Sequence, residues 1–145
     1  MKTRFRRTPH TVYELKYHFV FVPKYRYAVL EGKVKQIVKE AIGFVCQNMD
    51  IIVESGEICK DHVHLFLSIP PKHSPSEVMK QIKSISAQEV FERAPEIKEK
   101  YWGQHFWARG FCVSTVGIDE ETIRKYIANQ QREEENVKKQ LKLLH

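Results

Sequence analysis

Apolar and polar positions alternate along the chain in a way that predicts short strands separated by longer helices. Residues 13–22, YELKYHFVFV, are rich in aromatic and β-branched side chains and predict a strand. The last four residues of this stretch are apolar on both faces, as in a central strand. Residues 31–49 follow a helical period instead. The apolar residues of the helical stripe are Val34, Ile37, Val38, Ala41, Ile42 and Val45.

The middle of the chain predicts a β-hairpin followed by a second helix. Residues 50–58 and 62–69 predict two strands, and the short connection between them permits only an antiparallel pair. The segment PPKHSPSE then ends the hairpin and begins a helix. Ser74 is expected as the N-cap, Pro75 as the first helical residue and Glu77 as the third, which is the pattern of a capping box.

The last third of the chain completes the order of elements. Residues 94–109 predict a loop with short helical turns, and residues 110–115 predict a fourth strand. Asp119 is expected to cap a helix that starts at about residue 120 and extends toward the C-terminus. The order is therefore β-α-β-β-α-β with an additional C-terminal helix. It predicts an α+β, ferredoxin-like or RRM-like domain, with two helices on one face of a four-stranded antiparallel sheet and the other face open.

Length and composition favour one cytoplasmic domain. A chain of 145 residues with 42% hydrophobic residues suits a single core, with residues 1–12 as a basic arm and residues 136–145 as a C-terminal helical tail. No apolar run approaches the roughly 20 residues that cross a bilayer. The N-terminus lacks the apolar core of a signal peptide. The three scattered cysteines form no CxxC pair, which indicates reduced thiols.

Positive charge is concentrated at the N-terminal end. Residues 1–26 contain seven lysines and arginines against one acidic residue, whereas the rest of the chain contains 17 of each sign. A basic arm on a neutral body is typical of a protein with a polyanionic partner such as nucleic acid. A solvated tail has the same composition, so charge alone leaves both interpretations open. The residues expected to contact phosphates are Arg4, Arg6, Arg7, Lys24 and Arg26.

The segment KDHVHLFLSI, residues 60–69, carries two histidines two positions apart on a predicted strand. Because alternate strand residues share a face, His62 and His64 point one way, whereas Asp61, Val63 and the leucines after it point the other way. The histidines then lie on the open face of the sheet, where two ring nitrogens can bind one divalent ion. Ordinary half-buried histidines that bind no metal show the same spacing. The pair alone therefore does not identify a metal site, which requires at least a third ligand.

Tyr126 and Gln130 lie four residues apart on the predicted C-terminal helix, and hence on one helical face. Ile123 and Ile127 lie close to this face and are expected to pack it against a sheet. Gln130 offers an amide oxygen, an acceptable ligand for a hard ion such as Mg²⁺ or Mn²⁺. Tyr126 offers a phenolic oxygen, a candidate nucleophile. A packing aromatic and a solvated amide are the commoner roles of these residue types, so neither identifies a site alone.

Taken together, these features resemble the single-tyrosine HUH transposases of IS200-like insertion sequences, which move as single-stranded DNA. The HVH triplet at 62–64 matches the His-hydrophobe-His motif, and Tyr-x-x-x-Gln follows about 60 residues later. YHFVFVPKYR is similar to the family's first strand and basic turn, and DHVHLFLSIPPKHSPSEVMKQIKS to its metal strand and following helix. FWARGFCVSTVG and IRKYIANQ are similar to its last strand and tyrosine helix. The resemblance covers roughly residues 13–135.

The resemblance implies metal-assisted transesterification on single-stranded DNA. Tyr126 would attack a scissile phosphate and form a 5′-phosphotyrosine link, with Mg²⁺ or Mn²⁺ bound by His62, His64 and Gln130 as a Lewis acid. The implied partners are DNA hairpins at the ends of an insertion sequence. The resemblance also implies a homodimer in which the tyrosine helix of one subunit can complete the metal site of the other. Gly117, just before that helix, permits such an exchange but is equally suited to an ordinary turn.

Three other interpretations remain open at this point. A domesticated relative acting on chromosomal repeats would share the catalytic residues. A non-catalytic nucleic-acid-binding module would present aromatic residues on the open sheet face, which Phe66 shares with the histidines. A metal-binding regulator of the same shape would not need Tyr126.

The remaining aromatic residues and one histidine are expected to serve the fold. Four aromatics precede the last strand, and they are expected mainly to cover the core, with base stacking as an alternative. They are Tyr101, Trp102, Phe106 and Trp107. His18 is interpreted as structural. Cys59 is not expected to be a metal ligand, because thiolates suit softer ions.

Overall fold

A four-stranded antiparallel sheet forms the centre of a mixed α/β fold in the computed structural model, which describes residues 5–24, 28–101 and 105–144. The strand order is β4-β5-β3-β6. The strands are β3 (Lys16–Phe21), β4 (Ile52–Cys59), β5 (His62–Ser68) and β6 (Cys112–Ser114). The helices are α1 (Gly32–Asn48), α2 (Pro75–Arg93), α3 (Pro95–Lys98) and α4 (Glu120–Lys142). From β3 to β6 the chain follows the predicted strand and helix order, and α3 is one of the short helical turns predicted for residues 94–109.

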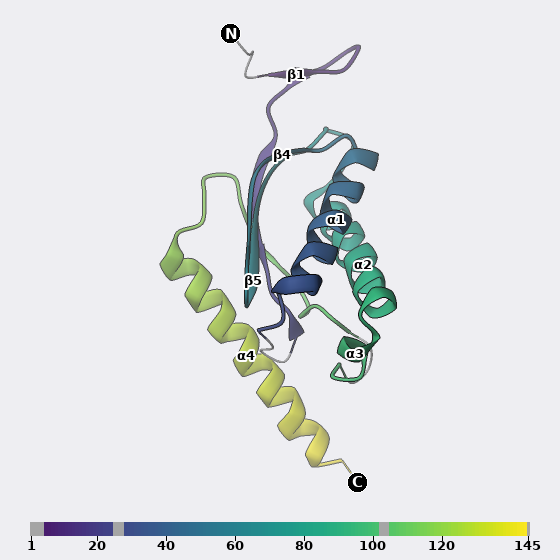
Figure 1. The fold of residues 1–145 in the computed structure, drawn as a ribbon. Helices are drawn as coiled ribbons and strands as arrows, with labels where there is room; N and C mark the ends of the chain where they lie inside the picture. The colour runs from purple at the N-terminus through teal and green to yellow at the C-terminus, as the bar shows by residue number, and fades with distance from the viewer. Residues whose placement is uncertain (1–4, 25–27, 102–104, 145) are drawn as a thin grey trace.

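Helices α1 and α2 cover one face of the sheet, and α4 lies against the other (Figure 1). The alternation of strand side chains explains this division. Phe19 and Phe21 of β3, together with Val63, Leu65 and Leu67 of β5, are buried in the core shared with α1 and α2. Burial of this apolar area, at roughly 25 cal/mol per Å², is the main force that holds the two helices on the sheet. On each strand, the residues that alternate with these buried ones face α4 or solvent.

The first strand is shorter than the sequence predicts. It begins at Lys16 rather than at residue 13, because Tyr13 belongs to a separate two-stranded sheet. In that sheet β1 (Arg6–Arg7) pairs antiparallel with β2 (Val12–Tyr13). The arm predicted over residues 1–12 therefore contains a β-hairpin in its described part. Figure 1 shows this hairpin beyond one end of the central sheet.

Arg6 attaches the hairpin to the rest of the molecule. Its guanidinium donates hydrogen bonds to the carbonyl oxygens of Ser68 at 3.1 Å and Asp50 at 2.9 Å. It also pairs with the Asp50 carboxylate at 3.3 Å and lies 5.4 Å from the centre of the Tyr13 ring. A single arginine thus satisfies carbonyl groups at the end of β5 and before β4, which fixes the hairpin relative to the sheet.

Both predicted helix caps are present. The Ser74 hydroxyl accepts a hydrogen bond from the Glu77 backbone N–H at 3.1 Å, and Asp119 accepts one from the Thr122 N–H at 2.8 Å. Each cap satisfies a donor that the first helical turn leaves unpaired. Helix α4 then continues without a break to Lys142, so most of the predicted tail belongs to it.

The last strand is also shorter than predicted, because it starts at Cys112 rather than at residue 110. Gly110 has φ +83°, a left-handed conformation that lies outside the strand region and favours glycine. The Lys83 ammonium group holds this turn by donating hydrogen bonds to the carbonyl oxygens of Ala108 and Gly110. The β-ladder can therefore begin only after the turn.

The aromatic residues before the last strand serve the core, as expected. Tyr101, Phe106 and Trp107 are buried, and the Trp107 indole donates a hydrogen bond to the Ser86 hydroxyl at 2.8 Å. Trp102 lies outside the described residues. Base stacking by the three buried rings is therefore incompatible with this arrangement.

The described residues bear on two further sequence predictions, one about the cysteines and one about membrane-spanning segments. The three cysteines, Cys46, Cys59 and Cys112, are free, in agreement with the interpretation as reduced thiols. Among the helices described here, none combines the length and apolar character needed to cross a membrane.

Candidate functional site

Strand β5 places His62 and His64 on the face of the sheet opposite α1 and α2. Val63, Leu65 and Leu67, at the alternate positions, are buried in the core, whereas the two histidines are half-buried. The sidedness predicted from the alternation is therefore confirmed. The pair lies on the same side of the sheet as α4.

Asp61 holds the His62 ring. Its carboxylate oxygen Oδ1 lies 2.9 Å from His62 Nδ1. The sequence prediction that Asp61 points away from the histidines is wrong, because Asp61 belongs to the turn before β5, where strand alternation does not apply. With Nδ1 facing a carboxylate, Nε2 is the His62 nitrogen left to bind a ligand.

His18 of β3 contacts the histidine pair, a relationship that sequence reasoning missed. Its Nδ1 atom lies 3.4 Å from His64 Nε2, and its ring stacks on Phe66 with centroids 4.1 Å apart and planes at 15°. The pairing register aligns His18 with Phe66 across β3 and β5. The sequence contained one signal that His18 lies on the same sheet face as His62 and His64. Phe19 and Phe21 point into the core, so His18 had to point to the open face with the other histidines.

Burial lowers the pKa of His64 below its ordinary value of 6.5, and the neighbouring His18 and His62 charges act in the same direction. The Glu57 carboxylate, which lies opposite His64 on β4, opposes the change. A lowered pKa keeps the imidazole neutral over a wider pH range. The neutral form is the one that binds a metal ion.

Helix α4 brings Tyr126 onto the same face of the sheet. Ile123 and Ile127 are buried, and together with residues below the helix they form a small apolar cluster against which Tyr126 packs. The other members of this α4 cluster are Val20, Val22 and Ala108. Val20 lies directly opposite His64 in the pairing of β3 with β5. The tyrosine therefore packs on a cluster that adjoins the histidine pair.

The Tyr126 hydroxyl is buried, and among the described residues no hydrogen bond of normal geometry reaches it. Burial raises the pKa of Tyr126 to about 12, and the nearby Cys112 and Glu133 act in the same direction. The amide of Gln130, one turn further along α4, acts in the opposite direction. A phenol in this state is a poor nucleophile until a cation or a polar group approaches its oxygen.

The predicted metal ligands are only partly brought together. His62 and His64 are neighbours, and Gln130 is half-buried on α4. In the described parts of the chain, no three His, Cys, Asp or Glu side chains are grouped so that they could hold a metal ion. The chemistry of the pair still suits a divalent ion, because one imidazole is oriented by a carboxylate and the other is kept neutral. The third ligand that the sequence predicts is the amide of Gln130, which is not one of these residue types.

The predicted phosphate contacts are distributed unevenly. Arg4 and Arg26 lie outside the described residues. Arg6 is half-buried and bonded to Ser68 and Asp50, whereas Arg7 is exposed on the hairpin. Lys24 is half-buried, and its backbone N–H donates to the Phe106 carbonyl at 2.9 Å. Arg7 is thus the most accessible of the predicted contacts that the structure describes.

Comparison with known proteins shows that this chain is a DNA transposase. The chain belongs to the family described as "Transposase IS200 like", whose model matches residues 11–130. It is 37% identical over 125 residues to the transposase of insertion sequence element IS200 from Salmonella typhimurium strain LT2, covering 86% of this chain and 82% of that protein. It is 36% identical over 124 residues to the ISDra2 transposase TnpA of Deinococcus radiodurans, covering 85% and 89%. The resemblance inferred from the sequence is confirmed.

Solved structures lead to the same class. A structure described as a transposase from Deinococcus radiodurans R1 matches with a TM-score of 0.76 and 31% identity, covering 86% of this chain and 97% of that one. A REP-associated tyrosine transposase bound to a REP hairpin matches with a TM-score of 0.53 and 14% identity, covering 83% and 68%. The second likeness concerns the fold alone. The protein is therefore an IS200-like transposase with a mixed α/β fold and an antiparallel sheet.

Proposed function

We propose that this protein cleaves and rejoins single-stranded DNA at the ends of an insertion sequence, with Tyr126 as the nucleophile. The observation that carries the proposal is the position of Tyr126 on the same sheet face as the histidine pair. Tyr126 packs against the α4 cluster, and Val20 of that cluster lies opposite His64. On a ferredoxin-like sheet with this face partly open, one DNA strand could reach both groups once Tyr126 leaves its buried position.

The reaction is a transesterification that exchanges one phosphodiester for another. The Tyr126 oxygen forms a bond to phosphorus and loses its proton, while the bond from phosphorus to the 3′ oxygen breaks and that oxygen leaves as a 3′-OH. The product is a 5′-phosphotyrosine link, which a second 3′-OH attacks in the reverse sense to reseal a strand. Phenolate, with an ordinary pKa near 10, leaves more readily than an alkoxide, so the step is reversible.

Four residues are proposed to prepare the phosphate. His62, His64 and Gln130 would hold Mg²⁺ or Mn²⁺, and the ion would supply Lewis-acid stabilisation of charge on a non-bridging oxygen. Asp61 orients the His62 ring through the 2.9 Å contact with Nδ1. The low pKa of His64 keeps its imidazole available as a ligand.

Tyr126 has to leave its buried state before it can attack. Its hydroxyl is buried, and its pKa is raised to about 12. Gly117 stands in the link between β6 and α4 with φ +106°, a conformation that favours glycine. We propose that a change of backbone angles in this link reorients α4, so that the phenol reaches the phosphate in the same subunit or in a partner subunit. A homodimer would make the second route available.

Hairpin DNA is the proposed partner. The likeness to a REP-associated tyrosine transposase bound to a REP hairpin supports this choice. The exposed Arg7 on the β1–β2 hairpin is placed to contact phosphates, and Arg4, Lys24 and Arg26 remain predicted contacts. A domesticated relative acting on chromosomal repeats would use the same residues, and the DNA that flanks the gene separates the two roles.

A covalent-adduct assay tests the proposal. The protein is mixed with end-labelled single-stranded oligonucleotides from the DNA flanking its gene, with Mg²⁺ or Mn²⁺, and then denatured. Label should migrate with the protein, and it should disappear with EDTA or with Tyr126→Phe. Tyr17→Phe is the matched control, because Tyr17 packs against the core on the other side of the sheet and should keep the adduct. Tight binding without any adduct would instead favour a non-catalytic nucleic-acid-binding module.

A further inference from the structure

A small open pocket lies on the sheet at the histidine pair, with His64 in its lining, and the proposed chemistry assigns no role to the other lining residues. It has a volume of about 220 Å³ and is lined by residues of β3, β4 and β5. They are His18, Ser55, Gly56, Glu57, His64 and Phe66. Pockets for drug-sized ligands are larger, at roughly 300–1,000 Å³. The pocket is therefore suited to a single ring system.

One side of the pocket is a planar aromatic stack. His18 and Phe66 lie nearly parallel, with centroids 4.1 Å apart. Ser55 lies opposite Phe66 in the pairing of β4 with β5, and Gly56 follows it. Ser55 shares the face of Phe66 and is small, so it leaves space beside the Phe66 ring, on the side away from His18. A flat ring that entered this space would continue the stack.

The charge of the pocket favours an uncharged ligand over a phosphate. Its lining, as far as the chain is described, contains a carboxylate, Glu57, and no lysine or arginine. The nearest cation along β3 is Lys16, which precedes His18 by two residues and lies 3.6 Å from the Glu54 carboxylate. A nucleotide could thus place its base in the pocket while its phosphates remain toward the histidines and Lys16.

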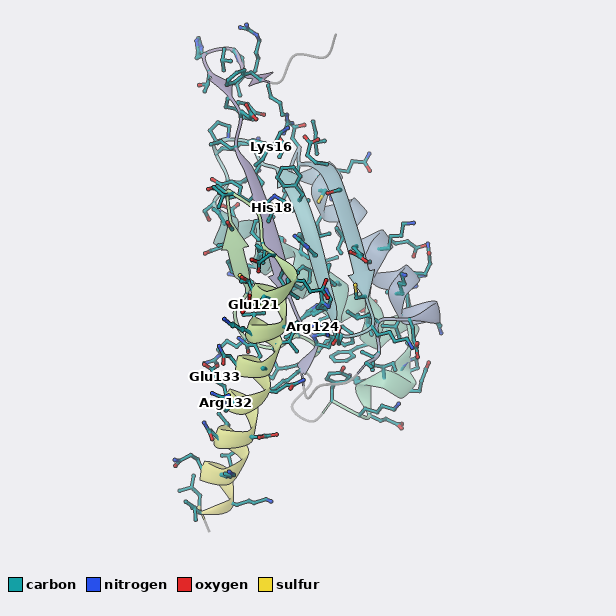
Figure 2. The ribbon with its side chains drawn as sticks, turned by 90° about the vertical axis from the view of Figure 1, so that its left-hand side faces the viewer. Lys16, His18, Glu121, Arg124, Arg132 and Glu133 are labelled. Atoms are coloured by element: carbon teal, nitrogen blue, oxygen red, sulfur yellow. The ribbon has the colours of Figure 1, made fainter. Side chains whose placement is uncertain are left out.

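Helix α4 leaves this part of the sheet uncovered. The α4 cluster lies over β3 and β6, where Val20 and Cys112 meet Ile123 and Ile127. Figure 2 looks onto this face, and Lys16 and His18 lie above the first turn of α4 in that view. The pocket is therefore accessible in the same conformation in which Tyr126 is buried.

We propose that this pocket is a stacking subsite for one unpaired nucleobase of the DNA strand, held against Phe66 next to the phosphate bound at His62 and His64. The inference rests on the proposed function for the identity of the polymer. It adds a binding determinant, Phe66, that is neither the tyrosine nor a metal ligand. Base stacking on an aromatic side chain tolerates any base, so the subsite fixes position along the strand rather than sequence.

Fluorescence of 2-aminopurine, which is quenched by stacking, tests the subsite directly. The base is placed in turn at each unpaired nucleotide of the flanking-DNA oligonucleotide, and Tyr126→Phe is used throughout so that the strand stays intact. We expect strong quenching at one position. Phe66→Leu should remove that quenching and weaken binding about 5- to 100-fold. Phe44→Leu is the matched control, because Phe44 is 58% exposed on α1, on the opposite side of the sheet.

Abasic DNA separates stacking from general damage to the fold. If the base is removed at the quenched position, Phe66→Leu and the parent protein should bind with equal affinity. A loss of affinity in Phe66→Leu that is as large on abasic DNA as on intact DNA would overturn the subsite, as would unchanged quenching. An absence of quenching at every position would overturn it too.

Failure of the subsite and failure of the proposed function give different results. Quenching that depends on Phe66, combined with no covalent adduct from the protein with Tyr126 intact, would leave the subsite standing and remove the proposed chemistry. A covalent adduct without Phe66-dependent quenching would support the proposed chemistry and remove the subsite.

Discussion

Nδ1 of His18 lies 3.4 Å from Nε2 of His64, across the register of β3 and β5. The contact fixes the orientation of the His64 ring from an adjacent strand, in the way that outer partners orient metal-binding histidines. His18→Phe retains an aromatic ring against Phe66 but removes the nitrogen. We expect Mn²⁺ affinity and adduct formation to fall about 10- to 100-fold, with single-stranded DNA binding in EDTA unchanged.

Isothermal titration with Mn²⁺ and a DNA-binding curve in EDTA measure the two effects separately. A parallel loss of DNA binding in His18→Phe would contradict a purely orienting role, because the ring nitrogen would then contribute to DNA binding itself.

Tyr126→Phe should stabilise the protein while it abolishes the covalent adduct. The hydroxyl is buried, makes no hydrogen bond of normal geometry in the described structure, and receives only a minor contribution from the Gln130 amide. A desolvated and unpaired group of this kind costs roughly 1–3 kcal/mol. Its removal leaves the ring packed against the α4 cluster. We expect the free energy of unfolding in urea to rise by about 1 kcal/mol. A decrease would show that the hydroxyl is paired in solution.

Much of this site could be predicted from the sequence because its determinants are local. Strand alternation placed His62 and His64 on the open face, and helical spacing placed Tyr126 beside Ile123 and Ile127. Both placements follow from the residue spacing within a single strand or helix and need no knowledge of the neighbouring elements. The family motif supplied the link between the two elements.

The contacts that escaped prediction depend on register and on turns. His18 meets His64 only because β3 pairs with β5 in one particular register, which a single sequence does not specify. Asp61 reaches His62 because it lies in a turn, where alternation fails. The β1–β2 hairpin was missed because Arg6 finds its partners near residues 50 and 68, far along the chain.

Arg6 and Arg7 should separate folding from DNA binding. Arg6→Gln removes hydrogen bonds to the Ser68 and Asp50 carbonyls, so the free energy of unfolding should fall by about 1–3 kcal/mol. Arg7→Gln removes an exposed cation, so stability should stay within about 0.5 kcal/mol. Arg7→Gln should instead weaken DNA binding and reduce the dependence of affinity on salt by about one counterion. Urea unfolding and salt titrations of DNA affinity measure both. Equal stability losses for the two substitutions would contradict the assignment.

Lys83 should give the protein a component of stability that increases with pH. Burial lowers its pKa from 10.5 to about 8. Between these values the unfolded chain binds a proton that the folded protein does not, so folding becomes more favourable as pH rises from 8 to 10.5. The full penalty of burying the charge is present below pH 8. Since the group keeps some contact with solvent, we expect about 2 kcal/mol over this window.

Comparison with Lys83→Met isolates this component from other titrating groups, among them Cys46, whose raised pKa acts in the opposite direction. The difference in unfolding free energy between the two proteins should change with pH from 8 to 10.5. Lys80→Met, an exposed position on the same helix, should follow the parent protein at every pH. A pH-independent difference would mean that Lys83 is neutral, or fully solvated, throughout the range.

The end of α4 is the surface on which we expect a second copy of the chain. Val137 and Leu141 continue the helical face of the buried Ile123 and Ile127, yet they are 57% and 48% exposed. Figure 1 shows this part of α4 extending past the sheet. In the sequence, three acidic residues at 133–135 precede Val137 and lysines follow it at 138, 139 and 142, so an antiparallel pair of helices would bring opposite charges together.

Leu141→Glu should therefore convert a dimer to a monomer in light scattering after size-exclusion chromatography. Leu143→Glu is the matched control, because Leu143 is the C-cap residue two positions further on, after the last helical residue, and is itself 75% exposed. High salt should weaken the association of the unmodified protein, since part of its attraction comes from exposed charges. If the dimer completes the active site, Leu141→Glu should also lower adduct formation while Leu143→Glu leaves it intact. A dimer that survives Leu141→Glu would move the interface to another surface, and a monomeric parent protein would require Tyr126 to act within its own subunit.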